Sequence, residues 1–171
     1  TLKPIHLIIG HNFIFTMCNG HSDVIAEVCG SYEEDFYQRA QSGGFLLFEL
    51  VDSLIYDYRQ TLGDLALDVE SMQKRLIQNH EDKNIFDDFS ILSASLLEFR
   101  NAIAAARESV DGLSNRRSSF IQESAQPFLE RQALPLDRLA GDATTERAIL
   151  SETLNLYMGM TSHKTNLVIN R

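Results

Sequence analysis

The chain closes with the run LNLYMGMTSHKTNLVINR, residues 154–171. This run continues a segment that starts at Pro127 and contains one further proline and two glycines. Nothing near its end resembles a helix-ending signal. A helix of about 40 residues is roughly 60 Å long at 1.5 Å per residue, far longer than an average globular helix. The sequence therefore predicts a helical rod over residues 127–171. Such rods are typical of coiled coils, stalks and the extramembrane parts of membrane proteins, and we expect the chain to be part of a larger protein.

One face of the predicted rod carries only small or neutral polar residues. They recur at steps of 3 or 4, which places them on one side of a helix: Asn155, Gly159, Ser162, Asn166 and Asn170. Solvated helix faces usually carry Lys and Glu, and this one has neither. Uncharged oxygen ligands can orient the water around a cation without trapping the ion. From the residues alone, an ordinary solvated face and an ion pathway both remain open.

Upstream of the rod, two long segments have apolar residues at helical spacing. In the first they are Leu47, Val51, Leu54, Tyr58, Leu62, Leu65, Val69, Met72 and Leu76; in the second they are Phe86, Phe89, Leu92, Leu96, Phe99, Ile103, Ala106, Val110 and Leu113. The polar connection at 79–84 is short, so the two helices are predicted to pack antiparallel as a helical hairpin against the rod.

The chain begins with two β-branched and aromatic runs, 5–9 and 13–17, joined by the three-residue loop 10–12. This pattern predicts a β-hairpin. Two strands alone are marginal in water, so we expect the hairpin to belong to a sheet whose other strands are partly missing here.

A helix is predicted from Ser22, as N-cap, to about Ala40. A glycine and serine at 30–31 could divide this helix, and the run Ser-Gly-Gly at 42–44 is expected to end it. The predicted fold class is α+β, predominantly α. We divide the chain into the end of an α/β subdomain (1–44), the helical hairpin (45–113) and a long C-terminal stalk helix (120–171).

Composition and motifs exclude several functions. A net charge of −9 and a pI near 4.9 argue against a nucleic-acid partner, because phosphates would be repelled, and are compatible with attracting cations. No stretch approaches 18 consecutive apolar residues, so this part of the protein is expected to be soluble by itself. No P-loop, dinucleotide-binding fingerprint, zinc-protease motif or nucleophile elbow is present, and the sequence predicts no enzyme activity.

A zinc site is one alternative for the N-terminal part. Cys18, His21 and Cys29 have a spacing that could hold zinc, with His11 or Glu27 as a fourth ligand. Cys29 follows Ile25 at helical spacing, which instead favours packing in a core.

Several motifs resemble the cytoplasmic part of the CorA family of divalent-cation transporters. The hairpin at 5–17 resembles that family's hairpin, and LVDSLIYDY at 50–58 is similar to the start of one of its helices. The returning helix carries two more similar segments, FRNAI at 99–103 and ARESV at 106–110. The most specific likeness is LYM at 156–158 followed by SHKTN, which in the family leads into the first transmembrane helix.

The resemblance implies a transporter or channel for Mg²⁺ or Co²⁺ that is gated by the stalk helix. The intact protein would be a homopentamer in the cell (inner) membrane, with this part on the cytoplasmic side and two membrane spans, joined by a Gly-Met-Asn loop, after residue 171. A ZntB-like zinc transporter domain is the alternative within this class. A soluble helical oligomerisation module unrelated to transport is the alternative outside it.

The resemblance also implies site residues. The ion pathway would be lined by Asn155, Ser162, Thr165 and Asn166, and Asp52 would be a metal ligand. Two positions depart from the family pattern. Arg131 stands where an aspartate helps to hold a regulatory Mg²⁺, and Asn155 stands where the family has a ring aspartate. An arginine cannot ligate Mg²⁺ and repels it, so the regulatory site is in doubt.

Overall fold

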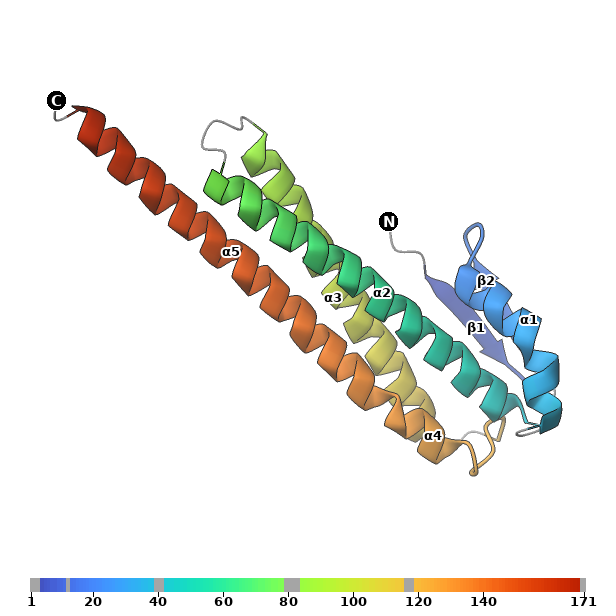
Figure 1. The fold of residues 1–171 in the computed structure, drawn as a ribbon. Coiled ribbons are helices and arrows are strands. Elements are labelled where there is room, and N and C mark those ends of the chain that lie inside the picture. Colours follow the sequence, from blue (N-terminus) through green and yellow to red (C-terminus); the bar gives the residue numbers. More distant parts are fainter. Residues whose placement is uncertain (1–3, 12, 39–41, 79–83, 116–118, 170–171) are drawn as a thin grey trace.

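The computed structural model describes residues 4–11, 13–38, 42–78, 84–115 and 119–169 (Figure 1). Its elements follow the order β1, β2, α1, α2, α3, α4 and α5. The described part is mostly helical, with one two-stranded antiparallel sheet. The predicted α+β, predominantly α fold class is therefore confirmed.

Three long helices run side by side as a bundle: α2 (Gly43–Gln78), α3 (Ile85–Asn115) and α5 (Ala133–Ile169). Figure 1 shows α2 and α3 antiparallel, with α5 running in the same direction as α2 along both. The predicted helical hairpin and its position against the rod are both confirmed. Because α5 is longer than its contact with the pair, its C-terminal end extends past them.

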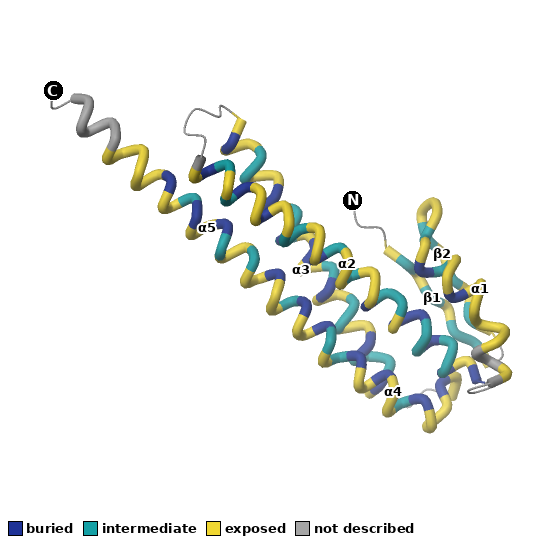
Figure 2. Tube along the Cα trace, viewed as in Figure 1, coloured by how far each residue is buried: buried dark blue, intermediate teal, exposed yellow. Residues whose placement is uncertain are grey.

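The apolar stripes of the sequence form the core between these helices (Figure 2). Leu96 and Ile103 of α3 are completely buried, and Leu65 of α2 is partly buried against them and their neighbours. One predicted member of the α3 stripe is wrong. Phe86 is 50% exposed, and Ile85 beside it takes the core position. Phe86 still contacts α5 through an edge-to-face contact with Tyr157, at 6.1 Å between ring centroids.

The rod does not begin at Pro127 as one continuous helix. A short helix, α4 (Gln126–Arg131), comes first, and Gln132 separates it from α5. Pro135 explains the break. Its ring lacks the N–H that would bond to the carbonyl of residue 131 and sterically disfavours a continuous helix there. The long C-terminal helix is thus confirmed from residue 133 onward.

The hairpin pairs β1 (Ile5–Ile9) with β2 (Ile14–Cys18), with Ile5 opposite Cys18 and Ile9 opposite Ile14. The second strand begins one residue later than predicted, because the Gly10 N–H bonds to the Phe13 carbonyl at 2.9 Å. The inner face packs against the base of the bundle. The outer face exposes four large apolar side chains, Ile8, Phe13, Phe15 and Met17.

Helix α1 (Asp23–Gln38) covers one side of α2 and is continuous through Gly30, so the possible division at 30–31 does not occur. The Ser22 hydroxyl accepts a hydrogen bond from the Ile25 N–H at 3.4 Å, as its predicted N-cap role requires. Ser42 has a different role from the one predicted. Its hydroxyl accepts from the Phe45 N–H at 3.2 Å and so caps the start of α2.

Candidate functional site

The last turns of α5 carry the predicted ion-pathway residues. The bundle-facing side of this stretch is defined by Leu150, which is completely buried, and by Tyr157, which is 7% exposed. Asn155 and Ser162 are exposed and lie on the opposite side of the helix. Thr165 and Asn166 belong to α5, but their side chains lie outside the described residues. The apolar contacts of Leu150 and Tyr157 therefore fix the rotation of α5 that presents Asn155 outward.

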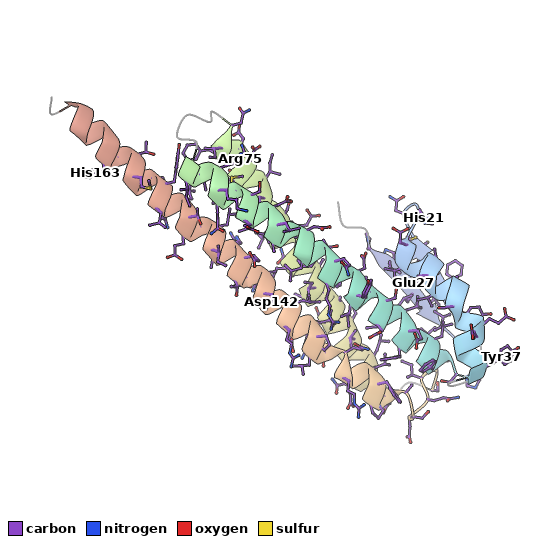
Figure 3. All side chains as sticks on the ribbon, viewed as in Figure 1. His21, Glu27, Tyr37, Arg75, Asp142 and His163 are labelled. Carbon is purple, nitrogen blue, oxygen red and sulfur yellow. The ribbon has the colours of Figure 1, made fainter. Side chains whose placement is uncertain are left out.

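The exposed stretch is neutral as well as polar. No Asp, Glu, Lys or Arg occurs from Asn155 to His163. Its exposed neighbours include Leu156, Met158 and Met160, each more than half exposed. Figure 3 shows His163 on the part of α5 that extends past Arg75, near the end of α2.

Polar contacts join α5 to both partner helices below this stretch. The Gln73 side-chain amide of α2 donates to the Thr153 hydroxyl at 3.1 Å, and that hydroxyl donates to the Ile149 carbonyl at 2.8 Å. Nearer the base, Arg107 of α3 contacts Asp137 of α5 at 2.8 Å. These contacts hold α5 from its base to Thr153. The exposed neutral stretch from Asn155 to His163 begins directly above them.

Asp52 lies on α2 and is exposed, with one oxygen engaged. The side-chain amide of Gln132 donates to Asp52 Oδ1 at 3.0 Å. Arg131 is exposed in the last turn of α4, where its charge complements the C-terminal end of the helix dipole. The structure thus places an amide N–H donor, which is not a cation ligand, against the predicted metal ligand.

The residues of the predicted zinc site have separate partners. The Cys18 thiol donates to the Gly20 carbonyl at 3.2 Å, and His21 contacts Asp23 at 3.1 Å. Glu27 accepts a hydrogen bond from Ser53 at 3.0 Å.

His11, the other proposed zinc ligand, lies edge-on to Phe120, with 6.2 Å between ring centroids. Cys29 is exposed, so the expectation that it packs in a core is wrong. Figure 3 shows His21 and Glu27 at separate positions on the hairpin side of the molecule. Within the described residues, no three His, Cys, Asp or Glu side chains are grouped to hold a metal ion.

Two open grooves flank the hairpin, with volumes of about 690 and 700 Å³. The first lies between the hairpin and helices α2 and α3, and the second lies between the hairpin, α1 and the start of α2. Neither is lined by Asp52, Asn155 or Ser162. Asn155 and Ser162 are exposed on the surface of α5, and neither groove includes them.

Two pKa shifts follow from the bundle contacts. Burial, with a smaller contribution from the charge of Asp57, raises the pKa of Tyr58, whose ring meets Phe99 edge-on at 5.8 Å. The hydrogen bond and charge of Asp137, aided by Asp111, raise the pKa of Arg107, which keeps this arginine charged. Both groups lie in the bundle and away from the exposed neutral stretch of α5.

Sequence reasoning missed the polar groups that fasten α5. Gln132 is 6% exposed and lies between Leu129 and Leu136 in the buried stripe, at steps of 3 and 4. Thr153 is 7% exposed and lies between Leu150 and Tyr157 at the same steps. The available signal was a polar residue at a core position of a helical stripe, which usually has a buried hydrogen-bond partner.

None of the described helices, α5 included, has an apolar segment of the length needed to cross a bilayer.

The model of the family described as "CorA-like Mg2+ transporter protein" matches residues 1–171. The chain therefore belongs to the CorA family. A curated relative, the cobalt/magnesium transport protein CorA of Thermotoga maritima, is 24% identical over 131 residues. That match covers 77% of this chain and 37% of the relative.

Two solved structures from Methanocaldococcus jannaschii share the fold. The complete CorA magnesium transporter has a TM-score of 0.77 at 14% identity, covering 98% of this chain and 57% of that one. The soluble domain of CorA has a TM-score of 0.72 at 13% identity, covering 92% and 69%. The chain thus spans little more than half of the complete transporter and about a third of the curated relative.

Proposed function

We propose that the chain is the cytoplasmic domain of a CorA-like transporter or channel that moves Mg²⁺ or Co²⁺ across the cell membrane. Family membership supports the class of protein, and the cobalt/magnesium transport relative supports the class of ion. The ion is cargo, no covalent chemistry is involved, and the protein is not an enzyme. Residues 1–44 act as the end of an α/β subdomain, 45–113 as the bracing hairpin and 120–171 as the stalk.

One observation of this chain carries the proposal. Helix α5 is held by its partners up to Tyr157, and its outward side carries the exposed, uncharged polar residues Asn155 and Ser162. In a homopentamer, five copies of this face would surround an axis, and Asn155, Ser162, Thr165 and Asn166 would line the ion pathway. Neutral oxygens can orient hydrated cations without binding them so tightly that release is slow. This neutral polar face is therefore better suited to the passage of hydrated cations than to tight cation binding.

The membrane part follows residue 171 in this proposal, and α5 transmits movement of the bundle to it. Gating is a movement of α5 together with α2 and α3, because the polar contacts of Thr153 and Asp137 join α5 to both partners. We do not propose a regulatory Mg²⁺ site at Asp52 and position 131. Arg131 repels cations, and the Gln132 amide that bonds to Asp52 presents an N–H donor and not an oxygen ligand.

The test is ion flux by the longer protein that contains this chain. Reconstituted in liposomes, it is expected to admit Mg²⁺ and Co²⁺ along their gradients, as reported by an enclosed fluorescent indicator. Zn²⁺ is included because a zinc transporter shares this architecture. Flux of Zn²⁺ alone would support that alternative. Absence of flux for all three ions, with the protein folded and correctly inserted, would refute the proposal.

A further inference from the structure

We infer that Gln132 and Asp52 form a metal-independent fastening between α2 and the junction of α4 with α5. At this point a side-chain amide and a carboxylate bond directly to each other, and the contact needs no bridging divalent cation. The inference goes beyond the proposed function, because it concerns how the base of α5 is held, whatever passes along its other end.

Gln132 is a buried polar residue at the junction of α4 and α5. Its side chain belongs to a residue that is 6% exposed, in a stripe whose neighbours Leu129 and Leu136 are almost completely buried. A primary amide in such a position is costly unless it is hydrogen-bonded. The bond to Asp52 Oδ1 at 3.0 Å supplies this partner, although Asp52 is 80 positions away in the sequence. A carboxylate acceptor makes this bond stronger than one between neutral groups.

Gln132 lies at the point where α4 and α5 meet. It is the residue at which α4 ends, and its own N–H bonds back to the carbonyls of Glu130 and Leu129. Pro135 prevents a continuous helix through this point, so backbone hydrogen bonds alone do not fix the angle between α4 and α5. The contact of Leu129 with the core is apolar and has no directional preference. The amide–carboxylate bond gives this junction a directional contact with α2.

The partner of Asp52 is a hydrogen-bond donor and not a second metal ligand. Mg²⁺ retains several waters and is usually held by one or two carboxylates. Here the second group is an N–H donor, with its nitrogen 3.0 Å from Asp52 Oδ1. Replacing that donor with a carboxylate would convert the fastening into a pair of acids. Such a pair repels itself without a cation and is bridged when one is present.

The experiment measures the melting temperature, Tm, of the 171-residue chain in EDTA and in millimolar MgCl₂, with ionic strength matched by NaCl. The native chain is expected to have the same Tm in both. Gln132→Glu is expected to lower Tm in EDTA by about 2–4 °C, the shift typical of one lost contact in a chain of this size. Mg²⁺ is expected to restore most of that loss with a saturating dose dependence.

Two variants control for the added charge. Gln122→Glu introduces the same charge at an exposed glutamine outside the junction and is expected to show no Mg²⁺ response. Gln132→Glu combined with Asp52→Asn leaves one carboxylate and is expected to lose the Mg²⁺ recovery. The inference is overturned if Mg²⁺ raises Tm of the native chain through Asp52, or if folded Gln132→Glu does not respond to Mg²⁺.

A second measurement applies if Gln132→Glu does not fold. Gln132→Ala and Asp52→Ala are compared with the double variant in EDTA. If the two side chains act as one fastening, the double variant is expected to lose little more Tm than the more severe single variant. Additive losses would show that the two residues act independently, and would overturn the inference.

Discussion

Leu150 and Leu156 lie on the same helix and meet opposite environments. Leu150 is completely buried among residues of α2 and α3, and Leu156 is 64% exposed. Leu150→Ala is expected to lower the free energy of unfolding by about 2–5 kcal/mol, from lost burial and the cavity left behind. Leu156→Ala on the same chain is expected to change it by less than about 0.5 kcal/mol. Urea unfolding followed by circular dichroism measures both, and equal losses would contradict the described rotation of α5.

Tyr58 gives the bundle a pH dependence in the alkaline range. Burial raises its pKa in the folded chain above the usual value of about 10. The unfolded chain then binds fewer protons than the folded chain once the pH exceeds about 10, so the free energy of unfolding falls as the pH rises from there. Tyr58→Phe is expected to reduce this slope in urea titrations between pH 8 and 11.

The matched control for Tyr58 is Tyr56→Phe. Tyr56 is on the same helix and is 57% exposed, so its replacement is expected to leave the slope unchanged. Ultraviolet titration of the folded chain provides a second readout. The native protein should contain one tyrosine that ionises at higher pH than the others, and Tyr58→Phe should lack it. Identical slopes for the native chain and Tyr58→Phe would show that burial of Tyr58 does not affect its ionisation.

At the scale of elements, helical periodicity predicted the bundle well, because each long helix buries one continuous stripe. Its errors fall at helix ends, where periodicity carries little information. Ser42 could end one helix or cap the next, and the choice depends on which backbone N–H groups it reaches. Pro135 is compatible with an early position in a helix, and only the break at Gln132 shows where α5 begins. Ile85 and Phe86 are both apolar, so sequence alone could not decide which one faces the core.

Ser42 as the cap of α2 leads to a prediction for that element. Its hydroxyl bonds to the Phe45 N–H and the residue is largely buried, so Ser42→Ala is expected to cost about 1 kcal/mol in the free energy of unfolding. Ser90→Ala is the control, because the exposed Ser90 hydroxyl only bonds back to the Phe86 carbonyl within α3. That replacement is expected to be neutral within about 0.5 kcal/mol, since alanine is the better helix former. Thermal or urea unfolding of both variants decides between the cap and an incidental contact.

The hairpin is the element whose environment is least complete. Its strands alternate as predicted, and the inner face packs on the bundle. Its outer face leaves Ile8, Phe13, Phe15 and Met17 each more than half exposed. Contiguous apolar surface of this kind is typical of a face that another layer covers. The expectation that the hairpin belongs to a larger sheet remains a prediction with this surface in its favour.

At the scale of the whole molecule, the candidate site divides into a predictable and an unpredictable part. Positions on one helix face follow from spacing alone, and Asn155 and Ser162 do share an exposed side of α5. Sites built from several elements do not follow from spacing. The Gln132–Asp52 bond joins residues 80 positions apart, and the proposed zinc ligands have separate partners. Such contacts depend on how the helices rotate against one another, which a single sequence does not specify.

In the longer protein, the outward face of α5 is expected to control ion flux. Asn155→Leu or Asn166→Leu is expected to reduce Mg²⁺ flux severalfold, because a ring of apolar side chains favours loss of water from the pathway. Asn166→Asp is expected to raise cation occupancy and slow release, since a ring of carboxylates binds Mg²⁺ more tightly than amides do. Asn101→Leu is the matched control, the same replacement at an exposed asparagine in the middle of α3. Flux into liposomes is compared at equal amounts of inserted protein. If Asn155→Leu and Asn166→Leu both transport as well as Asn101→Leu, the stripe is an ordinary solvated helix face and the assigned pathway is wrong.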